Sequence, residues 1–318
     1  MKCRGKKGAM RIGLIDVDGV HFPNLALMRI SAWHKARNDT VEWWWSDLIH
    51  YDSVYMSKVF SDAYSPDVPE PFNADEVIKG GTGYCITLGP DGRERFDAAK
   101  NLSLPPEVEA CFPDYSLYPQ YDFAVAMTSR GCSRRCPFCH VPAKEGCRSV
   151  KVADVRDFWN GQSKIKVLDP NITACPDKRD LMRQYRETGA FIDFTQGLDI
   201  RLLDDEDIMD INAMRLAEVH FAWDSAKENL APFFKRYAEQ AVHRPHGRYG
   251  TVYVLTNYNS TLDEDLYRIY TLRDLNFDPY VMVYNRPSAS REARAVQRWC
   301  NNRIIFGGCK RFEDYHWQ

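Results

Sequence analysis

Three cysteines at close, regular spacing are the residues of this sequence best suited to chemistry. Cys132, Cys136 and Cys139 form a C-x3-C-x2-C pattern within the segment Ser129–His140. Thiolates are soft ligands that select zinc or iron–sulfur centres. A [4Fe–4S] cluster normally takes four protein ligands, so three cysteines would leave one iron open to bind a small molecule. The pattern therefore predicts a metal centre with an open position.

Three other interpretations of the same cysteines remain open. Cys136-Pro-Phe-Cys139-His140 also fits the C-x-x-C-H pattern of covalent haem attachment. That attachment is typical of exported proteins, and the sequence predicts no signal peptide. A structural zinc ion would need a fourth ligand, either His140 or a distant cysteine. Inert burial is the least favoured, because the arginines and the glycine around the cysteines make poor core.

The surroundings of the cysteines resemble the radical S-adenosylmethionine (SAM) superfamily. Phe138 precedes the last cysteine, the apolar segment Phe123–Met127 comes just before the cluster, and the resemblance extends from Tyr121 to about Trp223. It implies that the cysteines bind three irons of a [4Fe–4S] cluster and that SAM chelates the fourth. An electron from the cluster would cleave SAM into methionine and a 5′-deoxyadenosyl radical, which takes a hydrogen atom from a substrate. A flavodoxin or ferredoxin is implied as the electron donor.

Two polar residues follow the apolar segment Lys164–Leu168, where the superfamily holds the amino group of SAM. Asp169 and Asn171 are the candidates. They stand where many members have a Gly-Gly-Glu element. The alternative is an Asx turn that simply leaves the strand.

A second polar group, formed by Gln196, Asp199 and Arg201, follows the segment Phe191–Phe194. By resemblance these residues would contact the ribose and the carboxylate of SAM. Arg201 suits the carboxylate because a guanidinium can donate two parallel hydrogen bonds to it. An internal Asp–Arg pair at a loop is the alternative.

Three further polar residues have only their position at the end of an expected strand in their favour. Asp224 is the strongest of them and is included among the SAM-binding candidates, while Asn257 and Asn285 are weaker. We expect the cysteines outside the triplet to be buried as small apolar residues. They are Cys111, Cys147, Cys175, Cys300 and Cys309.

Strands and helices must alternate from residue 121 onward to position these side chains. Helical segments such as Arg179–Thr188 and Asp263–Leu275 lie between short apolar segments. This alternation predicts a parallel (β/α) barrel, whole or partial, with its chemistry at the carboxyl ends of the strands. The expected strands are Phe123–Met127, Lys164–Leu168, Phe191–Phe194, Val219–Trp223, Thr251–Leu255 and Tyr280–Tyr284.

The first 100 residues read as a separate Rossmann-like domain, so the fold class is α/β throughout. Expected strands at Arg11–Val17, Thr40–Trp45 and Asp52–Val59 flank an amphipathic helix at Leu25–Ala36. Residues 101–120 contain four prolines and are expected to be a linker. Residues 121–318 would then form the barrel and a C-terminal extension.

This N-terminal domain resembles the cobalamin-binding-type domain fused to many radical SAM enzymes. The resemblance rests on Phe22–Trp33 and Thr40–Glu42, and Gly80-Gly-Thr-Gly83 would let the backbone approach a cofactor. The Asp-x-His-x-x-Gly motif that supplies a histidine to cobalt is absent, and Asp16–His21 does not match it. Some members bind cobalamin without that histidine, so cobalamin is a candidate cofactor. A domain that caps the barrel or binds substrate is the alternative. Aromatic residues in this domain are expected in a core or an interface: Trp43, Trp44, Trp45, Tyr51 and Tyr55.

Composition narrows the class of protein. The chain has 318 residues, 44% of them hydrophobic, and a net charge of −2, which is unlike the strongly basic surface of nucleic-acid-binding proteins. No apolar run is long enough to span a membrane. We therefore expect a cytoplasmic protein whose ten cysteines do not form a disulfide framework.

The function that fits these observations best is a radical SAM enzyme acting on an unidentified substrate, with cobalamin-dependent methyl transfer as one variant. The first alternative is a methylthiotransferase-like RNA modifier. That family carries cluster cysteines in its N-terminal domain, where this chain offers only Cys3 and Cys85. The second alternative is a non-enzymatic zinc-binding module.

Overall fold

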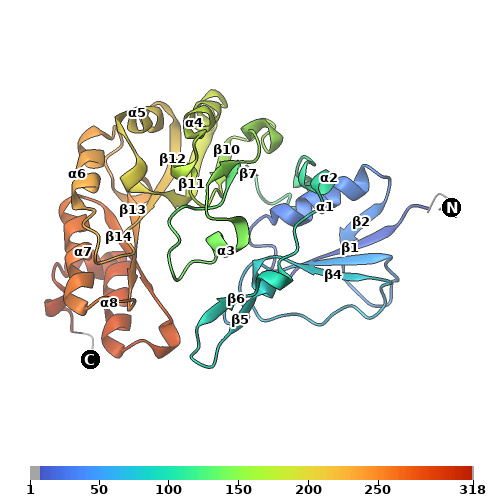
Figure 1. The fold of residues 1–318 in the computed structure, drawn as a ribbon, viewed down its shortest axis with the longest axis horizontal. Helices are drawn as coiled ribbons and strands as arrows, with labels where there is room; N and C mark the ends of the chain where they lie inside the picture. The colour runs from blue at the N-terminus through green and yellow to red at the C-terminus, as the bar shows by residue number, and fades with distance from the viewer. Residues whose placement is uncertain (1–7, 317–318) are drawn as a thin grey trace. The chain divides into compact units, whose positions relative to one another are not determined.

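Two parallel β-sheets organise the chain. The computed structural model describes residues 8–316, and the chain divides after Val125 into two compact units. Each unit is built on its own parallel sheet (Figure 1), which confirms the α/β class. None of the helices in the described part of the chain has the length and apolar character needed to cross a membrane.

The N-terminal sheet has four strands in the order β2-β1-β3-β4, all parallel. Helix α1 (Leu25–Lys35) begins at Asn24, whose side chain accepts a hydrogen bond from the Leu27 backbone. Because the strand order reverses between β1 and β3, the carboxyl edge of these two strands is where such sheets bind ligands. The strands are β1 (Arg11–Asp16), β2 (Thr40–Trp43), β3 (Ser53–Ser57) and β4 (Val77–Gly80).

The expectation that residues 101–120 are a linker is wrong. The segment contains a short helix, α2 (Pro106–Glu109), and it packs on the N-terminal unit. Val108, Leu117 and Tyr118 are buried in the same hydrophobic core as Ile12 of β1. The prolines prevent a long helix here, but the apolar side chains between them still gain free energy by burial.

The aromatic residues of the N-terminal unit meet the expectation of a core position with one exception. Tyr51 is fully buried, and Trp43, Trp44 and Tyr55 pack against the cores of this unit. Trp45 is 66% exposed. It lies two residues beyond the end of β2, outside the sheet.

The C-terminal sheet has six strands in the sequential order β14-β13-β12-β11-β10-β7. Among the described residues its two edge strands, β7 and β14, do not pair, so the sheet is open. This is the partial form of the expected barrel. The strands are β7 (Phe123–Ala126), β10 (Lys164–Val167), β11 (Phe191–Leu198), β12 (Arg215–Ala222), β13 (Thr251–Thr256) and β14 (Asp278–Val283).

Each strand from β10 onward is followed by a helix. Right-handed crossovers between sequential parallel strands place all of these helices on one face of the sheet, as Figure 1 shows. Phe221 of β12 packs on Phe234 and Tyr237 of the following helix, with ring centroids 6.0 and 4.9 Å apart. The helices are α4 (Lys178–Glu187), α5 (Asp205–Ala213), α6 (Ala231–Gln240), α7 (Leu262–Asp274) and α8 (Arg291–Asn301).

The opposite face of this sheet, here called the inner face, carries the alternate residues of each strand. Side chains alternate along a strand, so Glu218, His220 and Ala222 of β12 point away from the helices that Phe221 contacts. The remaining elements are short. They are α3 (Val141–Glu145), α9 (Arg303–Gly308), the pair β5 (Ile86–Leu88) and β6 (Glu94–Phe96), and the pair β8 (Ser129–Arg130) and β9 (Val150–Lys151).

A glycine at the end of β4 is needed for the N-terminal fold. Gly81 has φ +102°, and a Cβ atom there would lie 2.3 Å from the carbonyl oxygen of Lys58. We expect Gly81→Ala to lower the free energy of unfolding by about 2–4 kcal/mol, because it adds both backbone strain and a clash. Gly80→Ala is the matched control, since no atom lies within 4 Å of its added Cβ. Urea denaturation measures both, and equal stabilities would contradict this interpretation.

Candidate metal centre

The three cysteines of the triplet lie together in the loop that follows β8. All three are partly buried. The Cys136 thiol lies close enough to Cys139 and Cys132 to interact with both electrostatically, and the Cys139 thiol interacts with Cys132 in the same way. Burial raises the pKa of both Cys136 and Cys139, and the nearby Asp224 carboxylate raises it further. Thiols held in this way need a positive partner to become thiolates, and a bound metal ion supplies one.

Asp169 fixes the start of this loop. Its carboxylate accepts hydrogen bonds from the Thr128 backbone (2.9 Å), from the Thr128 hydroxyl (2.9 Å) and from the Ser129 backbone. The residue is 2% exposed, and burial raises its pKa. These hydrogen bonds tie the start of the cysteine loop to the end of β10. The SAM contact expected for Asp169 stays a prediction.

Asn171 forms the turn after β10 and also contacts a cysteine. Its side-chain oxygen accepts hydrogen bonds from the Thr173 hydroxyl (2.7 Å) and the Ala174 backbone (3.2 Å), as in the Asx-turn alternative. Its amide nitrogen lies 3.4 Å from the Cys132 sulfur. Hydrogen bonds to the sulfurs are one way in which proteins tune iron–sulfur clusters. Asn171 therefore contacts a candidate metal ligand.

A close approach of two backbone segments completes the loop. Gly131 has φ +84°, and a Cβ atom there would lie 2.1 Å from the Arg148 carbonyl oxygen. The next residue, Cys132, donates a backbone hydrogen bond to the Gly146 carbonyl at 3.2 Å. Only glycine allows the chain to pass this closely before the first cysteine.

Asp199 and Arg201 form an internal ion pair. The Arg201 guanidinium donates to both Asp199 oxygens, at 2.6 and 2.9 Å, and also contacts Glu228. Arg134, from the cysteine loop, donates to Glu228 at 2.8 Å. The structure thus contains the Asp–Arg pair that was the alternative interpretation of these residues. Through Glu228, Arg134 and Arg201 link the cysteine loop to the chain after β12. Sequence reasoning missed Glu228 because it stands well beyond the end of any strand.

Among the strand-end candidates, Asp224 is the one whose carboxylate interacts electrostatically with both Cys136 and Cys139. Burial raises the pKa of Asp224 to about 6, against the opposing effect of Arg268. Arg268 is 1% exposed and donates to the Trp223 carbonyl at 2.6 Å. No sequence pattern points to Arg268, because an arginine in a helix is ordinarily exposed.

Three other candidates do not join this group. Gln196 is exposed, and its side chain takes part in none of the hydrogen bonds or ion pairs found among the described residues. Asn257 and Asn285 have φ angles of 60° and 45°. Asparagine tolerates this left-handed conformation, so both residues serve the turns after β13 and β14.

The cysteines outside the triplet differ in burial. Cys175 and Cys300 are buried as expected, while Cys111 and Cys309 are only partly buried. Cys147 is exposed, so the burial expected for it is wrong. It follows Gly146, which ends α3 at φ 100° and turns the chain outward.

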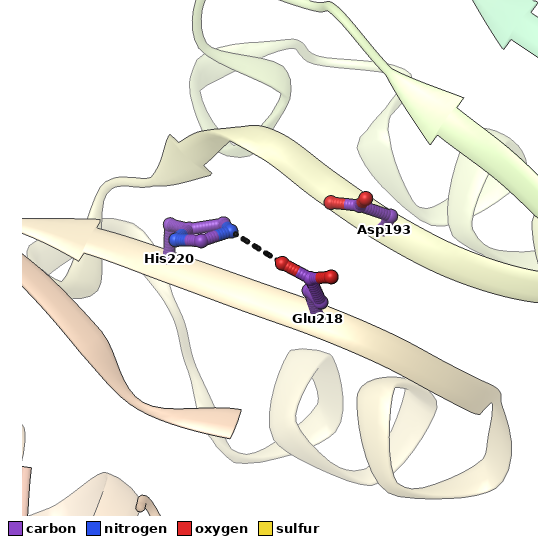
Figure 2. Close-up of side chains that lie close together, drawn as sticks. All are labelled: Asp193, Glu218 and His220. Atoms are coloured by element: carbon purple, nitrogen blue, oxygen red, sulfur yellow. Dashed lines mark ion pairs between the residues drawn. The ribbon is translucent and has the colours of Figure 1, made fainter. Parts of the chain in front are cut away.

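A second group of polar side chains lies on the inner face (Figure 2). One ligand atom from each of Asp193, Glu218 and His220 lies within 4.8 Å of the others. Lys166 and Lys164, however, place their ammonium groups 2.6 and 3.2 Å from Asp193. Two cations beside the shared carboxylate disfavour a metal ion at this position.

Contacts within the N-terminal unit occupy part of the carboxyl edge of its sheet. Tyr118 donates a hydrogen bond to Asp16 at 2.7 Å, and Asn24 donates to Ser57 at 2.9 Å. A Cβ atom at Gly83 would lie 2.2 Å from the Phe60 carbonyl, so the glycine loop packs against this unit's own backbone. Cobalamin stays a prediction from the sequence, and no step of the chemistry is assigned to it.

Comparison with known proteins gives little further information. No protein-family model and no curated protein matches the chain. Among solved structures, the chain is similar to TsrM from Kitasatospora setae, a radical S-adenosylmethionine methyltransferase with tryptophan substrate and a SAM analogue (aza-SAM) bound. The TM-score is 0.44 at 13% identity, over 86% of this chain and 67% of that one. A likeness at this level extends to no residue or activity.

A substitution at Asp169 separates a positioning role from a SAM-binding role. We expect Asp169→Asn to lower the free energy of unfolding by about 2–3 kcal/mol, because an amide replaces an acceptor among three buried donors. The variant should also retain less iron after anaerobic reconstitution. Asp177→Asn, at an exposed position, should change neither property. Normal stability and iron content together with weaker SAM binding would instead make Asp169 a SAM ligand.

Proposed function

We propose that this chain is a radical SAM enzyme that holds a [4Fe–4S] cluster on Cys132, Cys136 and Cys139. The observation that carries the proposal is the placement of these cysteines together in one loop at the carboxyl side of an open parallel sheet. Enzymes built on parallel (β/α) units carry their chemistry at this edge. The donor set is three soft thiols, which suits iron–sulfur or zinc.

The cluster would supply an electron that cleaves SAM, and the chain's own residues would hold the two groups. The three cysteines bind irons, and Asn171 donates a hydrogen bond to the Cys132 sulfur. Asp224 has no hydrogen-bond partner among the described residues, so its carboxylate is free to receive the ammonium group of SAM. The three cysteines are partly buried, which would limit the access of water to a bound cluster.

The ion pairs beside the loop would hold it in place. Arg134 links the loop to Glu228, and Arg201 links Glu228 to Asp199. Arg201 can bind the SAM carboxylate only by giving up one of these partners. We therefore assign Asp199 and Arg201 to positioning. The electron would come from an external one-electron donor of the flavodoxin or ferredoxin type.

No observation favours the methylthiotransferase alternative. Of the two cysteines that the N-terminal part offers, Cys3 lies outside the described residues. Cys85 is 1% exposed, and its thiol is 3.5 Å from the Gly81 carbonyl oxygen. A buried thiol of this kind is a small apolar residue of the core.

Formation of 5′-deoxyadenosine tests the proposal. Anaerobically reconstituted protein with SAM and dithionite should yield 5′-deoxyadenosine and methionine in equal amounts. Cys136→Ala should reduce the yield to the background without enzyme, because the cluster loses one of only three ligands. Cys147→Ala is the matched control, since this cysteine is exposed and outside the triplet. Wild-type protein that carries iron but releases no 5′-deoxyadenosine would overturn the proposal.

A further inference from the structure

The inner face of the C-terminal sheet carries a compact group of charged side chains that the proposed cluster does not use. Lys164 and Lys166 lie on β10, Asp193 on β11, and Glu218 and His220 on β12. Figure 2 shows Asp193 facing Glu218 and His220 from the neighbouring strand. Charges are rare in a core, so this face is suited to contact a polar molecule.

Asp193 is the buried residue at the centre of this group. It is 1% exposed and accepts hydrogen bonds from Lys166 at 2.6 Å and from the Thr195 hydroxyl at 3.0 Å. Lys164 lies 3.2 Å from the same carboxylate. A buried carboxylate needs such partners. Asp193 therefore orients the two lysines, and its three contacts leave it less capacity for a ligand than Glu218 has.

Glu218 and Lys164 keep unused capacity. The carboxylate of Glu218 lies 3.7 Å from Lys164 and 3.4 Å from His220, and no shorter polar contact to it is found among residues 8–316. Glu218 is 37% exposed and Lys164 28% exposed at their side chains. A carboxylate has about four acceptor positions, and an ammonium group has three donors. A free acceptor and a free donor of opposite charge thus lie side by side.

An aromatic surface adjoins this pair of charges. His220 stacks on Tyr253 with an interplanar angle of 9° and centroids 5.5 Å apart, and Tyr280 meets Tyr253 edge to face at 5.9 Å. Tyr280 and Met282, on the same face of β14, are 46% and 48% exposed. Exposed aromatic and thioether groups of this kind suit a ring or an apolar side chain.

We propose that the inner face binds a free α-amino acid with an aromatic or long apolar side chain. Its ammonium group would lie on Glu218 and its carboxylate on Lys164. The two lysines and two carboxylates of the group balance, so the site matches a ligand with one charge of each sign and no net charge. This inference rests on the proposed function and names the substrate class for it.

The distance from the proposed ammonium and carboxylate site to the cysteines decides which part of the amino acid would react. Glu218 and Asp224 are six residues apart on one extended segment, a distance of roughly 20 Å at about 3.3 Å per residue. On β12 itself the inner-face positions between them are His220 and Ala222. The side chain of the amino acid would therefore point toward the cysteine edge, and its α-carbon would lie furthest from it.

Calorimetry on the anaerobically reconstituted protein tests this inference, with L-phenylalanine, L-tyrosine, L-tryptophan and L-methionine as probes. At least one probe should bind, and its N-acetyl derivative and decarboxylated amine should each bind at least tenfold more weakly. Glu218→Gln and Lys164→Met should each weaken binding at least tenfold. Glu239→Gln and Lys235→Met are the matched controls, because these exposed residues of α6 pair with each other at 4.0 Å and with no other charged group in the described part of the chain. They should leave the affinity unchanged.

The comparison of analogues is made on wild-type protein and does not depend on how the variants fold. The inference is overturned if none of the four probes binds, or if the N-acetyl and amine analogues bind as well as the amino acid. In the same preparation, 5′-deoxyadenosine reports on the proposed function separately. If it forms while no amino acid binds, only the substrate class is wrong.

Discussion

The hydrogen bonds that Asp169 accepts from the start of the cysteine loop are the constraint on which the site depends. They join the end of β7 to the end of β10, so the loop leaves the sheet at a fixed place. Without them the paired donors of Thr128 and Ser129 would be buried and unsatisfied, at a cost of about 1–3 kcal/mol each. Gly131 then lets the backbone pass against Arg148, and the cysteines follow within a few residues.

The alternation of side chains along the strands divides the C-terminal unit into two regions with different roles. Phe221 and its neighbours on one face hold the helices by apolar burial. The other face carries Glu218 and His220, and its strand end leads to Asp224 beside the thiols. A single strand, β12, therefore contributes to the core, to the proposed amino-acid site and to the proposed SAM site. Because one face of β12 is not covered by helices, polar residues such as Glu218 and His220 can alternate with buried apolar ones in a central strand.

Periodicity and composition were enough to predict the strands and the alternation of β and α elements, because burial sets both. The placement of the three cysteines in one loop was predictable from spacing, since they are close in sequence. The roles of Asp169 and Arg201 were not, because they depend on donors that are distant in sequence or shared with Glu228. The inner-face group was also missed: Lys164 and Glu218 are 54 positions apart, and only the register of the sheet brings them together. Residues 101–120 were misjudged because proline content says nothing about tertiary packing.

The nature of the metal centre is the most direct test of this account. Iron, acid-labile sulfide and zinc are measured per chain after anaerobic purification and reconstitution, together with the ultraviolet–visible spectrum. The account predicts about four irons and about four sulfides per chain, held by three cysteines. One zinc ion with neither iron nor sulfide would contradict it, and would leave the triplet as a structural site.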